Sequence, residues 1–254
     1  MSINIGLLHA MDEFEDSNMI TVDHDYPFIV KLNVRKSDRF KKLFRNTYDK
    51  RVLNAFEHVT NCLVRSTGAN FGYYSSSSIV LVFFKTETYS QNILIGTVVQ
   101  KIVSATASNA TNIMAQYMFR NNFFENVEDA IFPTFDCKVF NVPNLFTLSK
   151  YIESRIELSK SSFIHNMFRK RTGKVLTNVN TKTMLATLNV LDIDIFEDAS
   201  PAAIEGMLIR RELNPEYDEF EKGVCKYLYI STPAKDFFKT PNREKLQYIK
   251  ELSA

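Results

Sequence analysis

Two apolar stretches, each with a polar interruption, stand out in the first third of the chain. One is Phe28 to Phe40, which is strand-like to Arg35 and then runs into polar residues. The other is Phe71 to Phe84, which contains four consecutive serines, Ser75 to Ser78. Both stretches are rich in β-branched and aromatic residues, which favour strands. We therefore predict a strand at the first stretch and a hairpin at the second, with the exact turn of the hairpin left open.

Helical spacing dominates between and after these strands. Apolar residues recur at intervals of three and four, which places them on one face of a helix. Ser37 or Asp38 is a suitable cap for the first helix, whose apolar stripe is interrupted near 46–50. The predicted helices cover about 38–59, 92–117 and 145–171, and a strand at 135–143 separates the last two.

The order of these elements predicts the fold class. Strand, helix, hairpin, helix and strand form the βαββαβ order of a ferredoxin-like unit, the palm architecture of polymerases and nucleotidyl cyclases. We expect an α/β protein with an antiparallel sheet and packed helices. A C-terminal helical and strand extension follows. Its predicted helices lie at 181–191, 200–213 and 241–252, and its strand lies near 220–228.

The predicted organisation is an N-terminal arm, a palm-like domain and an extension packed on the same unit, at 1–25, 26–175 and 176–254. The arm carries acidic runs at 12–16 and 23–25. Charge runs usually face solvent, so we expect the arm to be solvated or loosely docked.

Composition adds few constraints. A formal net charge of +2 is too small for nucleic-acid binding by bulk charge, so RNA contacts depend on local clusters of Lys and Arg. Cys62, Cys137 and Cys225 are far apart, which argues against a disulfide framework or a zinc site and for a reducing compartment. No stretch approaches the roughly 20 apolar residues of a membrane span. We expect a cytoplasmic protein without a membrane contact.

Three motifs carry a resemblance to a known family. Leu32-Asn33-Val34-Arg35, closed by Arg39-Phe40, has the frame of a motif that reads Leu-Asp-Gly-Arg in tRNA-histidine guanylyltransferases. Ser76-Ser77-Ser78 stands in the frame of their Ser-Asp-Glu motif, and Phe135-Asp136-Cys137-Lys138 in that of their Phe-Asp-Gly-Arg strand. The chain thus resembles this family of 3′ to 5′ nucleotide-adding enzymes over about 29–228.

The resemblance implies a two-metal site, and the residues at that site differ from the family pattern. Carboxylates hold Mg²⁺ in such sites, whereas the aligned positions carry Asn33, Ser77 and Ser78. Our leading interpretation is a catalytically degenerate relative, a pseudoenzyme without catalytic or metal-binding residues, for which no cofactor is expected. It would act by binding a protein, a nucleotide or RNA. The alternative is an active tRNA guanylyltransferase with an atypical metal site, which would use Mg²⁺ and ATP or GTP.

The resemblance also implies binding residues. Arg35, Lys101 and Ser108 fall in the frames of groups that contact nucleotide phosphates, although Lys101 is equally well explained as a surface charge. The candidate RNA contacts are Arg155, Arg169, Lys170, Arg171 and Lys222. A cationic helix end such as 169–171 also complements the helix dipole without any ligand. The partners implied are tRNA or other RNA, a nucleoside triphosphate or an unidentified protein, and the family's multimers imply a homo-oligomer.

Overall fold

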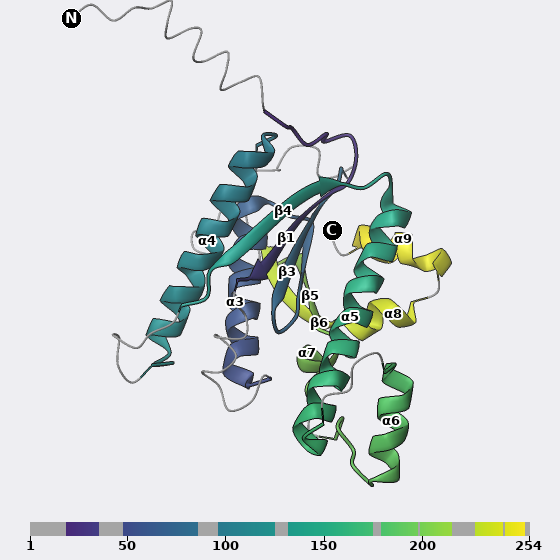
Figure 1. Cartoon of the computed structure of the whole chain (residues 1–254). Coiled ribbons are helices and arrows are strands. Elements are labelled where there is room, and N and C mark those ends of the chain that lie inside the picture. Colours follow the sequence, from purple (N-terminus) through teal and green to yellow (C-terminus); the bar gives the residue numbers. More distant parts are fainter. Residues whose placement is uncertain are drawn as a thin grey trace, which may run out of the picture.

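The computed structural model contains one six-stranded antiparallel sheet (Figure 1), with the strand order β4-β1-β3-β2-β5-β6. It describes residues 19–35, 48–85, 96–124, 132–174, 179–197, 199–214, 227–240 and 242–251. The strands are β1 Phe28–Val34, β2 Phe71–Tyr74, β3 Ser78–Phe83, β4 Phe135–Asn141, β5 Met207–Leu213 and β6 Tyr227–Pro233. The first four have the neighbour order 4-1-3-2 of a ferredoxin-like unit, which confirms the predicted fold class.

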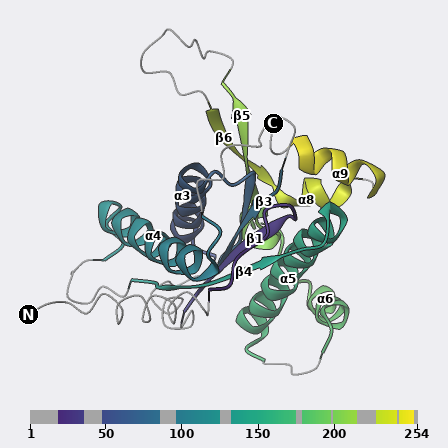
Figure 2. The same cartoon turned by 90° about the horizontal axis from the view of Figure 1, so that it is seen from above.

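Helices cover both faces of the sheet. The helices are α3 Lys50–Thr67, α4 Val99–Arg120, α5 Leu145–Thr172, α6 Thr181–Val190, α7 Pro201–Ile204, α8 Ala234–Lys239 and α9 Asn242–Glu251. Figure 2 shows α3 and α4 on one side of the sheet and α5, α8 and α9 on the other. Alternate residues of β1 therefore pack into two hydrophobic cores, one on each face of the sheet. Phe28, Val30 and Leu32 pack with α3 and α4, and Ile29 packs with α5.

The ends of the long helices follow their capping residues. Asp49 caps α3 by accepting a hydrogen bond from Arg51 N at 2.9 Å. Asn144 caps α5 by accepting one from Thr147 N at 2.8 Å. Gly173, with φ 69°, ends α5 in the left-handed conformation that favours glycine.

One predicted helix, at 200–213, is wrong after its first turn. Ser200 and Pro201 do begin a helix, but α7 ends at Ile204 and β5 begins at Met207. The change occurs at Gly206, whose φ is 80°. A Cβ atom there would lie 2.7 Å from the Tyr73 hydroxyl and closer still to the Tyr74 carbonyl oxygen. Only glycine fits this approach, and the chain then pairs with β2 as a strand.

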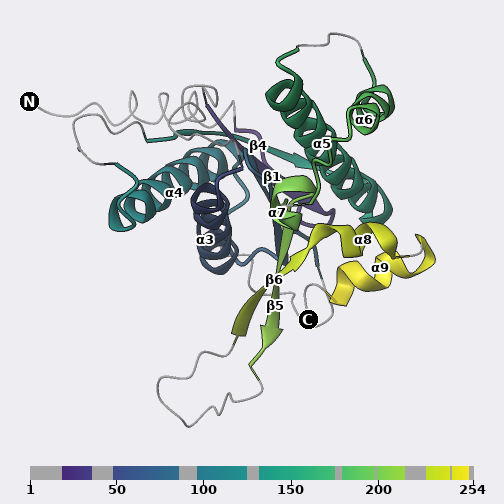
Figure 3. The ribbon, with the colours of Figure 1, turned by 90° about the horizontal axis from the view of Figure 1, so that it is seen from below.

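Two further features differ from the sequence prediction. The second helix begins at Val99, because residues 20–22 pair with Thr97 and Val98 and hold the backbone extended there. Of the strand expected near 220–228, residues 220–226 lie outside the described part of the chain, and Tyr227 and Leu228 belong to β6. Helix α8 was not predicted from the sequence. In Figure 3, β5 and β6 continue the sheet while α7 lies next to α5.

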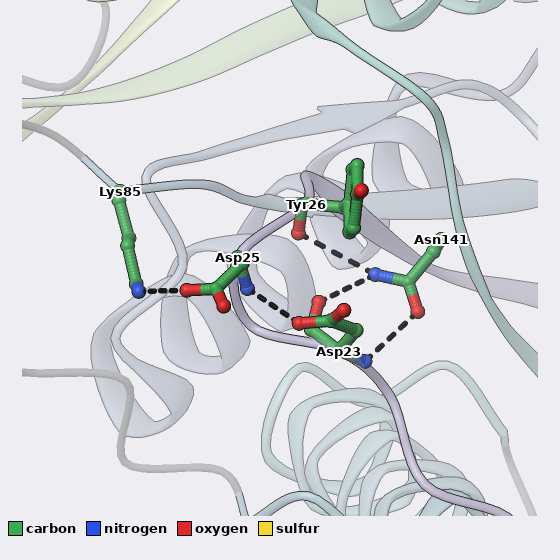
Figure 4. Close-up of polar contacts among 5 residues, drawn as sticks. All are labelled: Asp23, Asp25, Tyr26, Lys85 and Asn141. Carbon is green, nitrogen blue, oxygen red and sulfur yellow. Dashed lines mark hydrogen bonds and ion pairs between the residues drawn. The ribbon is translucent and has the colours of Figure 1, made fainter.

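The described part of the N-terminal arm is docked on the sheet. Val22 is buried, and its N–H donates to Thr97 O at 2.9 Å. The side chain of Asn141 holds the turn before β1 by hydrogen bonds to its backbone (Figure 4). Its amide donates to Asp23 O at 2.7 Å, and its carbonyl accepts from Asp23 N at 3.0 Å. Lys85 forms an ion pair with Asp25 beside it. Residues 1–18, with the acidic run 12–16, lie outside the described part.

Candidate functional site

Asn33 lies at the end of β1 between two polar side chains from neighbouring strands. It is opposite Ser78 on β3 and opposite Asp136 on β4. Directly opposed residues of an antiparallel pair point to the same face of the sheet. The motif at 32–35 and the serine motif at 76–78 are therefore adjacent in the sheet. Ser77 belongs to the turn, where its carbonyl oxygen accepts from Val34 N at 3.1 Å.

These three side chains share the face that α5 covers further along the sheet. Side chains alternate along a strand, so Asn33 points to the same side as Ile29, which packs in the α5 core. Ser78 likewise shares its side with Val80 and Val82 of that core. The site is therefore on the sheet face opposite to α3 and α4.

We call Asn33, Ser78 and Asp136, which lie side by side on three neighbouring strands, the polar row. Asp136 is the carboxylate of this row, and Arg35 forms an ion pair with it. Arg35 Nε lies 3.2 Å from Asp136 Oδ1, and the two side chains are 59% and 62% exposed. Arg35 is held in place by its own N–H, which donates to Thr134 O at 2.8 Å. An ion pair this exposed contributes only about 0–1 kcal/mol, so a stronger ligand could displace either partner.

A group of cations lies next to this row on the same face. Lys31 is two residues before Asn33 on β1 and directly opposite Lys138 on β4. Burial lowers the pKa of Lys31, and the nearby charges of Arg155 and Lys138 lower it further. We call Lys31, Lys138 and Arg155 the cation cluster. Among the described residues, no carboxylate forms an ion pair with any of the three.

Arg155 reaches the cluster from α5. Its guanidinium carbon lies 5.4 Å from the centre of the Tyr151 ring, a cation–π distance. Its Nε is buried and has no hydrogen-bond partner in the described part of the chain. The backbone behind it is fixed by Tyr73, whose hydroxyl donates to Arg155 O at 3.3 Å and to Glu205 O at 2.9 Å. The cluster therefore combines a firmly held backbone with unused donors.

A comparison with protein-family models identifies the family. The model described as tRNAHis guanylyltransferase (Thg1) matches residues 8–143, which include β1 to β4 and therefore the whole polar row. The chain belongs to this family.

Solved structures with Thg1-type folds agree with this assignment. A bacterial tRNA(His) guanylyltransferase (Thg1)-like protein in complex with ATP has a TM-score of 0.76 at 17% identity, and the match covers 98% of this chain and 99% of that one. A bacterial Thg1-like protein in complex with GTP gives 0.70 at 20% identity over the same shares. The tRNA(His) guanylyltransferase of Saccharomyces cerevisiae gives 0.64 at 14% identity, covering 77% and 90%. These identities show a common fold. No curated protein sequence matches the chain.

The polar row does not fit a pair of Mg²⁺ ions of the kind that the Thg1 resemblance implies. Such ions require charged oxygen ligands, and the row supplies one carboxylate, Asp136, which is already paired with Arg35. The amide of Asn33 and the hydroxyl of Ser78 carry no charge. Asp49 does not supply a further ligand, because it caps α3 and pairs with Arg51 at 2.8 Å, and hydrogen bonds from Arg51 lower its pKa. Asp38 lies outside the described residues.

The structure separates two of the expected phosphate-binding residues from this row. Lys101 and Ser108 are on α4, which covers the other face of the sheet. Ser108 lines a shallow hollow with Phe132 and Phe135. Lys101 is in the first turn of α4, about 15 Å along the helix from Thr111, the residue that bonds the start of β4. Arg35 and Arg155 are the expected residues that the structure does bring to the site.

The other expected RNA contacts lie further along α5. Arg169, Lys170 and Arg171 occupy its last turn, and Lys222 lies outside the described residues. Asp192 and Asp194 are in a turn after α6, where Asp194 accepts from Phe196 N at 2.7 Å.

Sequence reasoning missed Lys31 and Lys138. The signal that could have found them is the two-residue repeat of a strand. Lys31 and Asn33 share a face, as do Asp136 and Lys138, and both pairs stand in predicted strands.

Proposed function

We propose that this member of the Thg1 family binds the phosphates of a nucleotide or of RNA on the cation cluster and does not transfer nucleotides. The observation that carries the proposal is the pairing of Lys31 with Lys138 beside Arg155, with no carboxylate to neutralise them among the described residues. Like charges placed directly opposite each other destabilise a sheet. An anionic ligand would therefore offset the repulsion that Lys31 and Lys138 cause in the free protein.

The polar row has too little negative charge for nucleotidyl transfer. Nucleotidyl transfer through metal ions requires carboxylates that hold the ions against the phosphates. Here Asn33 and Ser78 flank a single carboxylate whose partner is a guanidinium. Arg35 already supplies a positive charge at that place, which favours phosphate binding that is independent of metal. A bacterial Thg1-like protein with the same fold has been solved in complex with ATP, which supports a nucleotide as ligand.

Calorimetry at low salt tests the binding part of this proposal. ATP and GTP are titrated into the full chain with Mg²⁺ and with EDTA, and we expect similar affinities that weaken steeply as salt is added. Loss of a charge-assisted hydrogen bond costs about 1.5–3 kcal/mol, so Lys31→Gln/Lys138→Gln should lower the affinity by at least tenfold. Lys101→Gln, on the opposite face, is the matched control and should leave it unchanged.

Two outcomes contradict the proposal. Addition of guanylate to a tRNA 5′ end by the unmodified protein with Mg²⁺ and GTP would establish the active enzyme instead. Absence of any nucleotide or RNA binding at low salt would leave a protein partner as the better explanation of the retained fold.

A further inference from the structure

A second cavity lies away from the polar row, between the start of α3, the end of α5 and α7. Its volume is about 590 Å³, within the usual range for sites that hold small ligands. In Figure 1, α7 lies between the lower ends of α3 and α5. Neither Asn33 nor any member of the cation cluster lines this cavity. It therefore needs its own explanation.

The inner wall of the cavity is aromatic and apolar. Tyr48 and Phe163 have ring centres 4.9 Å apart at 58°, and Met167 lies beside them on α5. Asn166 Nδ2 donates to the Tyr48 hydroxyl at 3.1 Å, which fixes that ring. Aromatic and thioether side chains of this kind are suited to the faces of a flat heteroaromatic ring.

Hydrogen-bonding groups and cations complete the lining at two different places. Asn54 and Glu57, on successive turns of α3, offer an amide and a carboxylate to the edge of a ring. Lys50, Lys170 and Arg171 lie exposed around the cavity, and none forms an ion pair with another described residue. The carboxylates of Asp194 and Glu197 also line the cavity, and that of Asp194 accepts a hydrogen bond within its own turn.

We propose that this cavity binds a nucleoside phosphate. The base lies against Tyr48 and Phe163 with its edge toward Asn54 and Glu57, and the phosphate lies against Lys170 and Arg171. Base stacking on aromatic side chains combined with a cationic path for phosphates is how proteins bind single nucleotides of a strand. Arg155 and Lys170 belong to one helix and are about 22 Å apart along its axis, so a strand bound at the cavity would extend toward the cation cluster.

The inference rests on the proposed function only for its general preference for phosphates, and its test is separate. Fluorescence and calorimetric titrations use the full chain with AMP, GMP and a five-nucleotide single-stranded RNA at low salt. Binding of the mononucleotides identifies a free nucleotide as the source, whereas binding of the RNA alone identifies a strand. Either result supports the proposal if the variants below agree.

The decisive variants separate the cavity from general positive charge. Lys170→Ala/Arg171→Ala should weaken binding by at least tenfold. Arg169→Ala/Lys174→Ala removes equal charge at the same helix end without touching the cavity, and it should weaken binding by less than twofold. In the Lys31→Gln/Lys138→Gln background, Met167→Trp, which fills the cavity at a partly exposed position, should abolish mononucleotide binding while the thermal midpoint is kept.

Each contrary result has a definite meaning. Equal loss in the two double variants, or binding unaffected by Met167→Trp, would overturn the cavity as the site. Failure of every probe to bind would do the same. Lys31→Gln/Lys138→Gln should leave mononucleotide binding at the cavity intact, so failure of the cation cluster and failure of the cavity are distinguishable.

Discussion

Lys31 on β1 and Lys138 on β4 occupy directly opposed positions of one antiparallel pair. The sheet thus places two positive charges side by side near its edge, with Arg155 close enough to affect Lys31. Such an arrangement costs stability in the free protein, and the size of that cost can be measured.

Changing Lys138 to Glu converts the repulsive cross-strand pair into an attractive one. Cross-strand charge pairs are worth about 0.2–1 kcal/mol each, so we expect the variant to be more stable by an amount in that range. Urea unfolding at low salt measures the gain, and Lys138→Gln should give a smaller one. The difference between Glu and Gln should fade in 1 M NaCl. A Glu variant less stable than the Gln variant would show that the two side chains do not interact.

The lowered pKa of Lys31 predicts a dependence on alkaline pH. Because its folded pKa lies below the value of 10.5 in the unfolded chain, the unfolded state binds more protons between the two values. Stability from this group therefore rises as pH increases through that window. Lys31→Met, which keeps the length of the side chain, should be more stable than the native protein at neutral pH. That advantage should shrink toward pH 10.5, and an advantage that stays constant with pH would refute the assignment.

Carboxylates introduced into the polar row should bind metal. Asn33→Asp/Ser78→Asp adds two carboxylates in register with Asp136, which gives three across three strands. Carboxylate oxygens hold Mg²⁺ and Mn²⁺, so we expect Mn²⁺ binding by calorimetry to be clearly tighter than in the native protein. Without metal the variant should be less stable, because like charges then oppose each other. Asn33→Ala/Ser78→Ala is the control, and a pair of Asp residues at these positions with no gain in affinity would argue against the metal-site frame.

Gly206 gives a prediction about the fold. Alanine there meets both a positive φ and the atoms of Tyr73 and Tyr74, whereas alanine at Gly173 meets a positive φ of 69° with open space around it. The left-handed conformation alone costs about 1–2 kcal/mol. We expect Gly173→Ala to lose roughly that amount in urea unfolding and Gly206→Ala to lose clearly more. Equal losses would mean that the contact with β2 relaxes freely.

The sequence predicts those parts of the fold that depend on periodicity or capping residues within a single segment. The strand that begins at Phe28, the hairpin around the serines and the long helix before Gly173 each have their own periodicity or cap, and the structure confirms them. β5 escaped prediction because Ser200 and Pro201 are a true helix start, and the cause of its early end is the distant carbonyl of Tyr74. The cation cluster was missed for a similar reason. Lys31, Lys138 and Arg155 come together through strand pairing and helix placement that local patterns do not encode.

The late position of β5 in the sequence has a consequence for synthesis of the chain. β2 is flanked by β3, which follows it directly, and by β5, whose residue Arg210 pairs with Phe71. Translation proceeds at about 5–20 residues per second, so several seconds separate the emergence of β4 from that of β5. During that interval a nascent palm carries an open, apolar strand edge, which is a template for pairing with another chain. A polypeptide that stops before Met207 keeps this edge permanently and should be held by chaperones or aggregate, even though every strand of its ferredoxin-like unit is present.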